Sequence, residues 1–331
     1  MSEVLLTEQL DQAVSILLLD AEATPPSLDS EIAALLNIAA DLRALPRADF
    51  KARLRSELEG RTLMTTKIAA NSAAETAGKT REGFRAVTPY LTVPDVFAEV
   101  EFIKAAFGAE GQVYGLGSAG GYHSEYKVGD SMVMIGGGGG KSKWKGEPAP
   151  ASLHLYVENV DEVYQRSLQA GAKSIMPPTD MDYGERGAAI EDTGGNHWYI
   201  ATAQGPAYVP EGLPALMPFF NPVGATRLID FLKQAFGAEV VERHQSPEGI
   251  VHHAKIRIID SIIETGEAHG AWQPRPMHFM LYVDDADAWY ARAMKAEGVT
   301  SMGEPSDQPY GARVGTIKDP FDNVWYIATQ L

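Results

Sequence analysis

The sequence predicts an α+β fold made of four βαβββ modules, and two observations support that prediction. A long stretch of the chain is written twice, because the pattern at residues 153–161 returns at residues 279–287. Within each copy, apolar residues alternate as in strands, apart from one run per module with helical spacing. The repeat period exceeds about 100 residues, whereas solenoid repeats run about 20 to 50. The copies are therefore expected to be duplicated domains.

Composition limits the class of protein. The chain has 331 residues, 45% of them hydrophobic, which suits about two domains. A formal net charge of -16 argues against non-specific binding to nucleic acid or to anionic membranes. The absence of cysteine excludes disulfides and thiolate ligands, so a metal would need His, Asp or Glu. No long apolar run occurs, and the N-terminus lacks a signal peptide's basic residues, so we expect a cytoplasmic protein.

The first 60 residues read as an N-terminal helical segment. Apolar residues recur there at helical spacing, as at Leu6, Leu10 and Val14, and again at Ile32 and Leu35. Such a small set of helices must dock on something or pair with another copy, so a homodimer is one possibility. Residues 61–83 are rich in Thr, Ser, Ala and Lys and read as a linker.

The modules follow in order. Strand 87–93 leads to helix 96–107, which ends at Gly108, and strands 122–128 and 131–135 form a hairpin across Gly129. The second module has strand 151–157, helix 160–170 and strands 173–177, 188–192 and 197–202, and residues 215–265 and 277–329 repeat both modules. We therefore predict domains at 84–205 and 212–331. Whether modules pair within each copy or are exchanged between copies stays open.

Several motifs recur in both copies. They include Phe-x-x-x-Ala-Phe-Gly-Ala-Glu (102–110, 231–239) and a closing Asp-x-x-x-Asn-x-Trp-Tyr-Ile-Ala-Thr (192–202, 319–329). Over residues 86–331 the chain resembles the vicinal-oxygen-chelate superfamily of glyoxalase, bleomycin-resistance and extradiol-dioxygenase proteins, in its PhnB-like branch. The resemblance implies that paired modules form incomplete barrels whose concave faces hold a small-molecule ligand. In the enzymes of that superfamily, metal ligands lie on the first and last strands of each module.

The second copy contains candidate metal ligands. Strand alternation turns His278 toward the concave face, and both His278 and Glu264 lie near ligand positions implied by the resemblance. They would suit a divalent metal, with His253 as third ligand or general base, so His253 and His278 are the candidate catalytic residues. Met217 and Tyr326 occupy the remaining positions, so the alternative is a metal-free hydrogen bond between His278 and Glu264. In the first copy the corresponding positions hold no usual ligand.

Other polar and aromatic side chains are predicted to line the ligand cavities. They share a strand face, or belong to the Tyr-Gly-x-Arg motif found in both copies: His123, His154, Tyr156, Arg186, Tyr199, Tyr282, Arg313 and Tyr326. Such a set would suit a planar or anionic molecule. The alternative for the two arginines is that they tie a turn to its sheet. Trp198 and Trp325, on the opposite strand face, are expected in the core.

Three functions remain open. The favoured one is a small-molecule-binding protein related to glyoxalase and bleomycin-resistance proteins, without a family-type metal site in its first copy. The second is a metal-dependent lyase or dioxygenase-type enzyme that uses the second copy. The third is a regulatory or scaffold protein whose helical segment docks a partner. The glycine run at 136–140 resembles a phosphate-binding loop, but no helix is predicted after it, so it reads as a flexible link.

Overall fold

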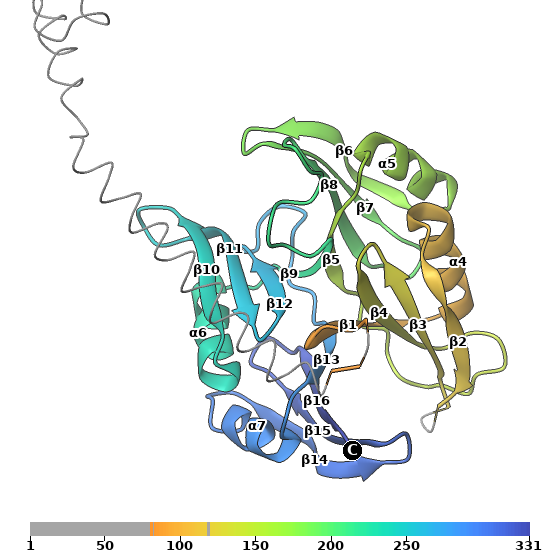
Figure 1. The fold of residues 1–331 in the computed structure, drawn as a ribbon, viewed down its shortest axis with the longest axis vertical. Coiled ribbons are helices and arrows are strands. Elements are labelled where there is room, and N and C mark those ends of the chain that lie inside the picture. Colours follow the sequence, from red (N-terminus) through yellow and green to blue (C-terminus); the bar gives the residue numbers. More distant parts are fainter. Residues whose placement is uncertain (1–79, 82, 118–119) are drawn as a thin grey trace, which may run out of the picture. The chain divides into compact units, whose positions relative to one another are not determined.

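The computed structural model describes residues 80–81, 83–117 and 120–331. The helices predicted within residues 1–60 lie outside the described residues, as does most of the predicted linker. In the described part, four modules follow one another along the chain, each a strand, a helix and three strands (Figure 1). The predicted α+β class and βαβββ order are therefore confirmed.

The first two modules place their elements close to the predicted positions. Module 1 contains β1 (Val87–Val93), α4 (Val96–Phe107), β2 (Glu110–Leu116), β3 (Tyr122–Val128) and β4 (Ser131–Gly137). Module 2 contains β5 (Ser152–Tyr156), α5 (Val160–Gln169), β6 (Lys173–Met181), β7 (Glu185–Glu191) and β8 (His197–Ala203).

The other two modules repeat this order. Module 3 contains β9 (Leu216–Phe220), α6 (Ala225–Phe236), β10 (Glu239–Gln245), β11 (Val251–Ile258) and β12 (Ser261–Thr265). Module 4 contains β13 (His278–Tyr282), α7 (Ala286–Ala293), β14 (Thr300–Gln308), β15 (Ala312–Lys318) and β16 (Val324–Gln330).

Capping groups explain where the helices begin and end. The Asp95 carboxylate accepts hydrogen bonds from two backbone N–H groups of the first turn of α4. Gly108 and Gly237 end α4 and α6 with φ angles of 70° and 66°, a left-handed conformation that glycine adopts readily. No helix in the described part of the chain is long and apolar enough to cross a membrane.

Strand pairing answers the question that the sequence left open. One eight-stranded sheet has the order β14-β15-β16-β13-β1-β4-β3-β2, and the other has the order β10-β11-β12-β9-β5-β8-β7-β6. Modules 1 and 4 thus form one sheet, and modules 2 and 3 form the other; we name them the 1/4 sheet and the 2/3 sheet. At the centre of each sheet, the first strands of its two modules pair antiparallel: β1 with β13 in the 1/4 sheet, and β5 with β9 in the 2/3 sheet. The terminal strands of each order do not pair, so neither sheet closes into a barrel.

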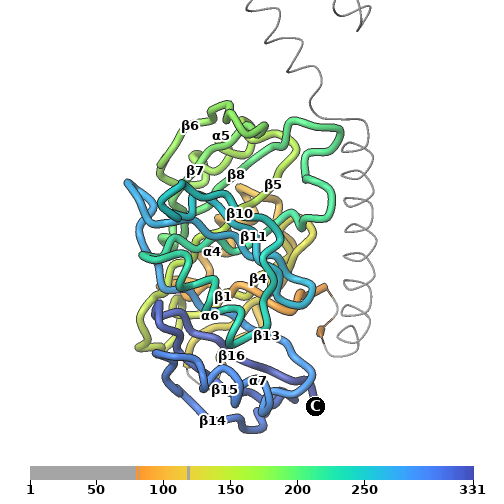
Figure 2. Tube along the Cα trace, turned by 90° about the vertical axis from the view of Figure 1, so that its left-hand side faces the viewer, coloured from red at the N-terminus to blue at the C-terminus, as the bar shows by residue number. Residues whose placement is uncertain are grey.

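The helices and a shared core join the two sheets. Helix α4 packs beside α5, and α6 beside α7, so each helix pair joins a module of one sheet to a module of the other (Figure 1). Figure 2 shows β5–β8 and β14–β16 at opposite ends of the described part. One hydrophobic cluster contains Leu91 and Phe279 of the 1/4 sheet and Leu153 of the 2/3 sheet. Trp198 and Trp325 are fully buried in this cluster, as predicted.

Each sheet turns one face toward this core, and we call the opposite face its outer face. Along β11, Ala254 and Ile256 are buried in the core, while His253 and Lys255 alternate with them and lie on the outer face. The same alternation on β3 buries Tyr126 in the core and turns His123 and Glu125 outward. The outer faces are where the histidines and tyrosines predicted to bind a ligand gather.

Candidate functional site

Two histidines flank a buried glutamate on the outer face of the 2/3 sheet. Glu264 Oε2 on β12 lies 2.6 Å from Nδ1 of His154 on β5, and Glu264 Oε1 lies 3.5 Å from Nε2 of His253 on β11. Glu264 is 1% exposed and His154 is 8% exposed. The cluster joins residues of both copies, because β5 and β9 pair at the centre of this sheet. All three residues were predicted to lie on ligand-facing strand faces, but their contact was not predicted.

Electrostatics make His154 and Glu264 an ion pair. Burial alone would lower the pKa of His154, but the Glu264 carboxylate outweighs burial and raises it. Burial would raise the pKa of Glu264, but the charge and hydrogen bond of His154, with a smaller contribution from His253, hold it far below its usual range. The raised pKa favours the imidazolium form of His154. No described residue bonds to its Nε2, so this nitrogen can donate to a ligand.

An aromatic wall stands beside this cluster. The Tyr199 ring stacks on Trp272, with centroids 4.3 Å apart, and on Phe219, with centroids 5.3 Å apart. The Phe219 ring lies 6.0 Å from the ring of His253, and the Tyr199 ring lies 6.3 Å from that of His154, so the aromatic rings reach both histidines. On the other side, the Tyr156 hydroxyl donates to Glu185 over 2.6 Å. Tyr199 and Tyr156 were predicted here, whereas Phe219 and Trp272 were not.

His278 lies in the other sheet, which corrects the predicted pairing with Glu264. Its Nδ1 is 3.0 Å from Oγ1 of Thr92 on β1, and its ring meets the edge of Tyr326 with centroids 6.1 Å apart. Burial lowers the pKa of His278 to about 4, so the ring is neutral at pH 7. The two residues separate because β12 belongs to the 2/3 sheet and β13 to the 1/4 sheet. His278 therefore does not share a site with His253 either.

A second polar cluster occupies the outer face of the 1/4 sheet. His123 Nδ1 lies 3.2 Å from the Tyr90 hydroxyl, and His123 Nε2 lies 3.2 Å from Glu125. A Cβ on Gly136 would come within 2.3 Å of the Tyr90 hydroxyl, so glycine leaves room for this ring. Both oxygens of Glu125 accept hydrogen bonds from Arg81. His123 was predicted here, whereas Arg81, Tyr90 and Glu125 were not.

Strand alternation could have found Glu125, since it lies two residues from His123 on the same strand. Arg81 gave no such signal, because it falls in the predicted linker. Tyr282, also predicted here, packs edge-on against Phe84 with ring centroids 6.0 Å apart.

Arg186 and Arg313 do not join either cluster, which corrects their assignment as ligand-lining residues. Arg186 on β7 bonds to Asp161 of α5 and to Asp180 of β6, and Arg313 makes the equivalent bonds to Asp287 and Asp307. Each arginine thus bonds to the partner strand of its hairpin and also to a helix, whereas the alternative considered for the Tyr-Gly-x-Arg motif was a tie between a turn and its sheet.

Comparison with known proteins identifies the family. The model of the Glyoxalase/Bleomycin resistance protein/Dioxygenase superfamily matches residues 83–200 and 224–327. The chain belongs to this superfamily. Among solved structures, glyoxalase I from Zea mays is similar with a TM-score of 0.57 at 14% identity, over 73% of this chain and 92% of that one. A glyoxalase I variant from the same plant gives a TM-score of 0.56 at 14% identity, over 78% of this chain and 96% of that one. Identities this low show the fold alone.

A relative from Mycobacterium bovis, named only as an uncharacterized protein, is 30% identical over 127 residues. The match covers 35% of this chain and 81% of the relative. A relative from Mycobacterium tuberculosis is also 30% identical over 127 residues, which cover 35% of this chain and 72% of that protein. Neither name supplies an activity.

The metal positions implied by the superfamily resemblance are poorly filled here. In the 2/3 sheet they correspond to Ser152, Tyr199, Met217 and Glu264, and in the 1/4 sheet to Thr88, Met134, His278 and Tyr326. Each set contains a single residue that commonly binds metal, and the Glu264 carboxylate is already bonded to His154. Across residues 80–331, as far as described, no three His, Asp or Glu side chains are grouped to hold an ion. The residues present therefore do not fit a family-type metal.

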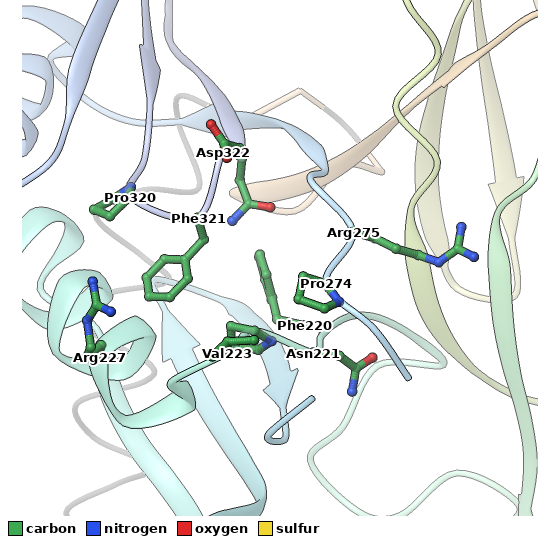
Figure 3. A pocket seen from close by; sticks show the side chains of 11 residues that line it. Phe220, Asn221, Val223, Arg227, Pro274, Arg275, Pro320, Phe321 and Asp322 are labelled. Atoms are coloured by element: carbon green, nitrogen blue, oxygen red, sulfur yellow. The ribbon is translucent and has the colours of Figure 1, made fainter. Parts of the chain in front are cut away.

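A separate pocket of about 240 Å³ lies between modules 3 and 4 (Figure 3). It is bounded by the β9–α6 loop, the segment before β13 and the β15–β16 turn, with Phe220, Pro274 and Phe321 near its centre. Phe220 and Phe321 belong to the core cluster or pack against it. None of the lining residues belongs to either outer-face cluster, so we assign the pocket no part in the candidate site.

Proposed function

We propose that this protein binds a planar aromatic small molecule at the outer face of the 2/3 sheet and does so without a metal. The observation that carries the proposal is the buried Glu264 between His154 and His253, beside the ring of Tyr199. A binding site typically combines apolar and aromatic walls with a few polar groups that fix orientation. The superfamily fold supports a small-molecule ligand.

Each group has a part in this proposal. The ligand ring stacks along Tyr199 and its neighbour Trp272, whose rings are already parallel within 29°. The free Nε2–H of His154 donates to a phenolate or carboxylate oxygen of the ligand. The positive charge of the His154 imidazolium offsets the negative charge of this ligand. Glu264 favours the protonated form of His154, and His253 places a second imidazole 3.5 Å from the other oxygen of Glu264.

We also place the chain in the PhnB-like branch of the superfamily. The support is sequence-based, since the Phe-x-x-x-Ala-Phe-Gly-Ala-Glu motif and the closing Trp-Tyr-Ile-Ala-Thr motif recur in both copies. This placement adds no catalytic residue to the proposal.

The test is calorimetric titration with salicylate and 4-nitrophenolate, using protein treated with a chelator. Binding should survive the treatment and weaken at least about tenfold in His154→Gln and Tyr199→Ala, because each variant removes one of the two main contacts. Tyr326→Ala is the matched control, since Tyr326 holds the equivalent place in the 1/4 sheet. Loss of binding on chelation with recovery on adding Zn²⁺ or Mn²⁺, or equal loss in both tyrosine variants, would refute the proposal.

A further inference from the structure

The geometry of the other sheet points to a second binding site of opposite charge preference. We infer that the outer face of the 1/4 sheet binds an organic cation of the guanidinium or amidinium class, and that Arg81 occupies this site in the absence of ligand. The inference goes beyond the function proposed above, because it concerns a different sheet, different residues and a different ligand class.

A buried carboxylate supplies the charge. Glu125 on β3 is only 4% exposed, yet both of its oxygens face the guanidinium of Arg81, with Nη2 at 2.7 Å from Oε2. Burial would raise the pKa of Glu125, but hydrogen bonds from His123 and Arg81 lower it to about 2, so the group is charged at neutral pH. A buried charge without a partner is costly, so this site requires a cation.

The cation that fills the site comes from outside the sheet. Arg81 precedes β1 and belongs to no strand, and its side chain is 36% exposed. The ion pair therefore lies where a molecule from solvent can compete for the carboxylate. The two parallel N–H···O contacts are the geometry that guanidinium and amidinium ions share in binding a carboxylate.

Aromatic rings complete the site. The Arg81 guanidinium carbon lies 4.5 Å from the centre of the Phe84 ring, and Phe84 in turn packs against Tyr282. Next to Glu125, the His123 ring is stacked between Tyr90 and Tyr114, with centroids 5.7 Å and 5.9 Å away. Aromatic faces around a carboxylate favour an organic cation through cation–π attraction.

The internal duplication shows that the fold does not require this ion pair. His123 and His253 are equivalent, which makes Lys255 on β11 the counterpart of Glu125. Lys255 is instead paired with Glu242 over 2.8 Å. The equivalence of Phe84 and Leu213 likewise places Pro210 at the position of Arg81. A module of this kind thus folds without the carboxylate and without the arginine, so the pair is specific to the 1/4 sheet.

Because Arg81 belongs to the same chain, it competes with any ligand at a high effective concentration. Wild-type protein should therefore bind a simple cation weakly, and removing Arg81 should strengthen that binding. The probe is benzamidine, whose amidinium can replace the guanidinium on Glu125 while its ring extends along Phe84. Benzamide has nearly the same shape without the charge and is the control ligand.

Calorimetry should show benzamidine binding to Arg81→Met at least about tenfold more tightly than to wild type. The double variant with Glu125→Gln should lose this binding, and benzamide should bind none of these proteins. Arg186→Met is the matched control, because it removes another arginine with two carboxylate partners but leaves no cluster of aromatic rings. It should show no gain over wild type.

Any of three results would overturn the inference: an affinity gain below twofold in Arg81→Met, equal binding of benzamide, or an equal gain in Arg186→Met. If Arg81→Met does not fold, the wild-type protein provides the test. Benzamidine at tens of millimolar must then raise the thermal unfolding midpoint of wild type and must not raise the midpoint of Glu125→Gln. The absence of such a rise also overturns the inference. Salicylate binding at the 2/3 sheet should be unchanged in Arg81→Met, so the two proposals fail independently.

Discussion

His154 is buried and His278 is partly buried, and their surroundings move the pKa values of the two imidazoles in opposite directions. Burial lowers the pKa of His278 to about 4, whereas the Glu264 carboxylate outweighs burial and raises that of His154. We expect the His278 ring proton signals in ¹H NMR to titrate near pH 4 and those of His154 to titrate above the usual value of about 6.5. His278→Gln and His154→Gln assign the two signals. Two midpoints close to 6.5 would contradict the described environments.

The ion pair between His154 and Glu264 should contribute strongly to stability. Replacing one partner of a buried pair leaves the other charge uncompensated, so Glu264→Gln should lower the free energy of unfolding by about 3 to 5 kcal/mol at pH 6. The raised pKa of His154 means that the pair's contribution is lost as pH rises through that pKa. The lowered pKa of Glu264 means that the contribution of the ion pair to stability is also lost in strong acid, as Glu264 becomes protonated.

Urea unfolding at pH 6 and at successively higher pH measures the first of these losses, and the difference in stability between wild type and Glu264→Gln should shrink as the pH rises. Glu101→Gln is the control, because the Glu101 side chain is 72% exposed and its surface salt bridge with Lys104 should contribute little to stability. A Glu264→Gln variant as stable as this control would show that the pair contributes little.

Residue-level prediction from sequence succeeded where strand alternation decides and failed where pairing between distant modules decides. Alternation placed His154, His253 and Glu264 on ligand-facing strand faces. It could not show that Glu264 meets His154 and not His278, because that contact depends on which modules share a sheet. Arg81 could not be predicted at all, since nothing about a residue before the first strand indicates where its side chain reaches.

Among the elements, the β14–β15 hairpin allows a direct test of backbone strain. Gly311 in its turn has a φ of 82°, and a Cβ there would meet no atom of the described residues within 4 Å, so we expect the effect of Gly311→Ala to come from backbone conformation. We expect it to destabilise the protein by about 1 to 2 kcal/mol. Gly303 on β14 also has free space but no positive φ, so Gly303→Ala should be neutral or slightly stabilising. Equal thermal midpoints for the two variants would contradict this explanation.

Helix α4 contains a buried acid that the second copy lacks. Glu99 is fully buried and its Oε2 has no hydrogen-bond partner among the described residues, while its equivalent on α6 is Leu228. Burial and the nearby Asp192 raise the pKa of Glu99 well above its usual range, so folding requires the protonated form and loses stability as pH rises. Glu99→Leu should therefore stabilise the protein, by about 1 to 4 kcal/mol at neutral pH.

The gain from Glu99→Leu should be smaller at pH 4, where the unfolded chain is also largely protonated at this position. Chemical denaturation at the two pH values gives the comparison, and the reciprocal Leu228→Glu should be strongly destabilising at neutral pH. A loss of stability in Glu99→Leu would mean that the hydrogen bond from Asn196 to Glu99 outweighs the burial of the carboxyl group.

Element boundaries followed the sequence where apolar periodicity is strong. Strand β1, helix α4 and strand β3 have the predicted ends, because buried residues and a terminal glycine mark them. Strand β2 was not predicted, because neither an apolar pattern nor a terminal glycine indicates its ends. Its residues include two glycines and are mostly exposed, as befits the last strand of the 1/4 sheet, so they do not alternate between apolar and polar.

At the scale of the whole described unit, the duplication was visible in the sequence but the pairing of modules was not. The first strands of all four modules are short and largely buried, so their residues fit either arrangement. The structure pairs β1 with β13 and β5 with β9, and half of each copy therefore lies in each sheet. This arrangement brings His154 and Glu264 of different copies together, so the candidate site depends on it.

Pairing between copies predicts that neither copy folds alone. In an isolated fragment 80–210, β1 and β5 would each lack their central antiparallel partner, β13 and β9. Fragments 80–210 and 211–331 should each lack cooperative thermal unfolding, and mixing them should restore it. The control is a protease site inserted between residues 205 and 211 and cleaved after folding, where the two pieces should stay together in gel filtration. If fragment 80–210 is a monomer with a cooperative transition of its own, each copy can complete its core within itself, and the observed strand order is not the one that stabilises the protein.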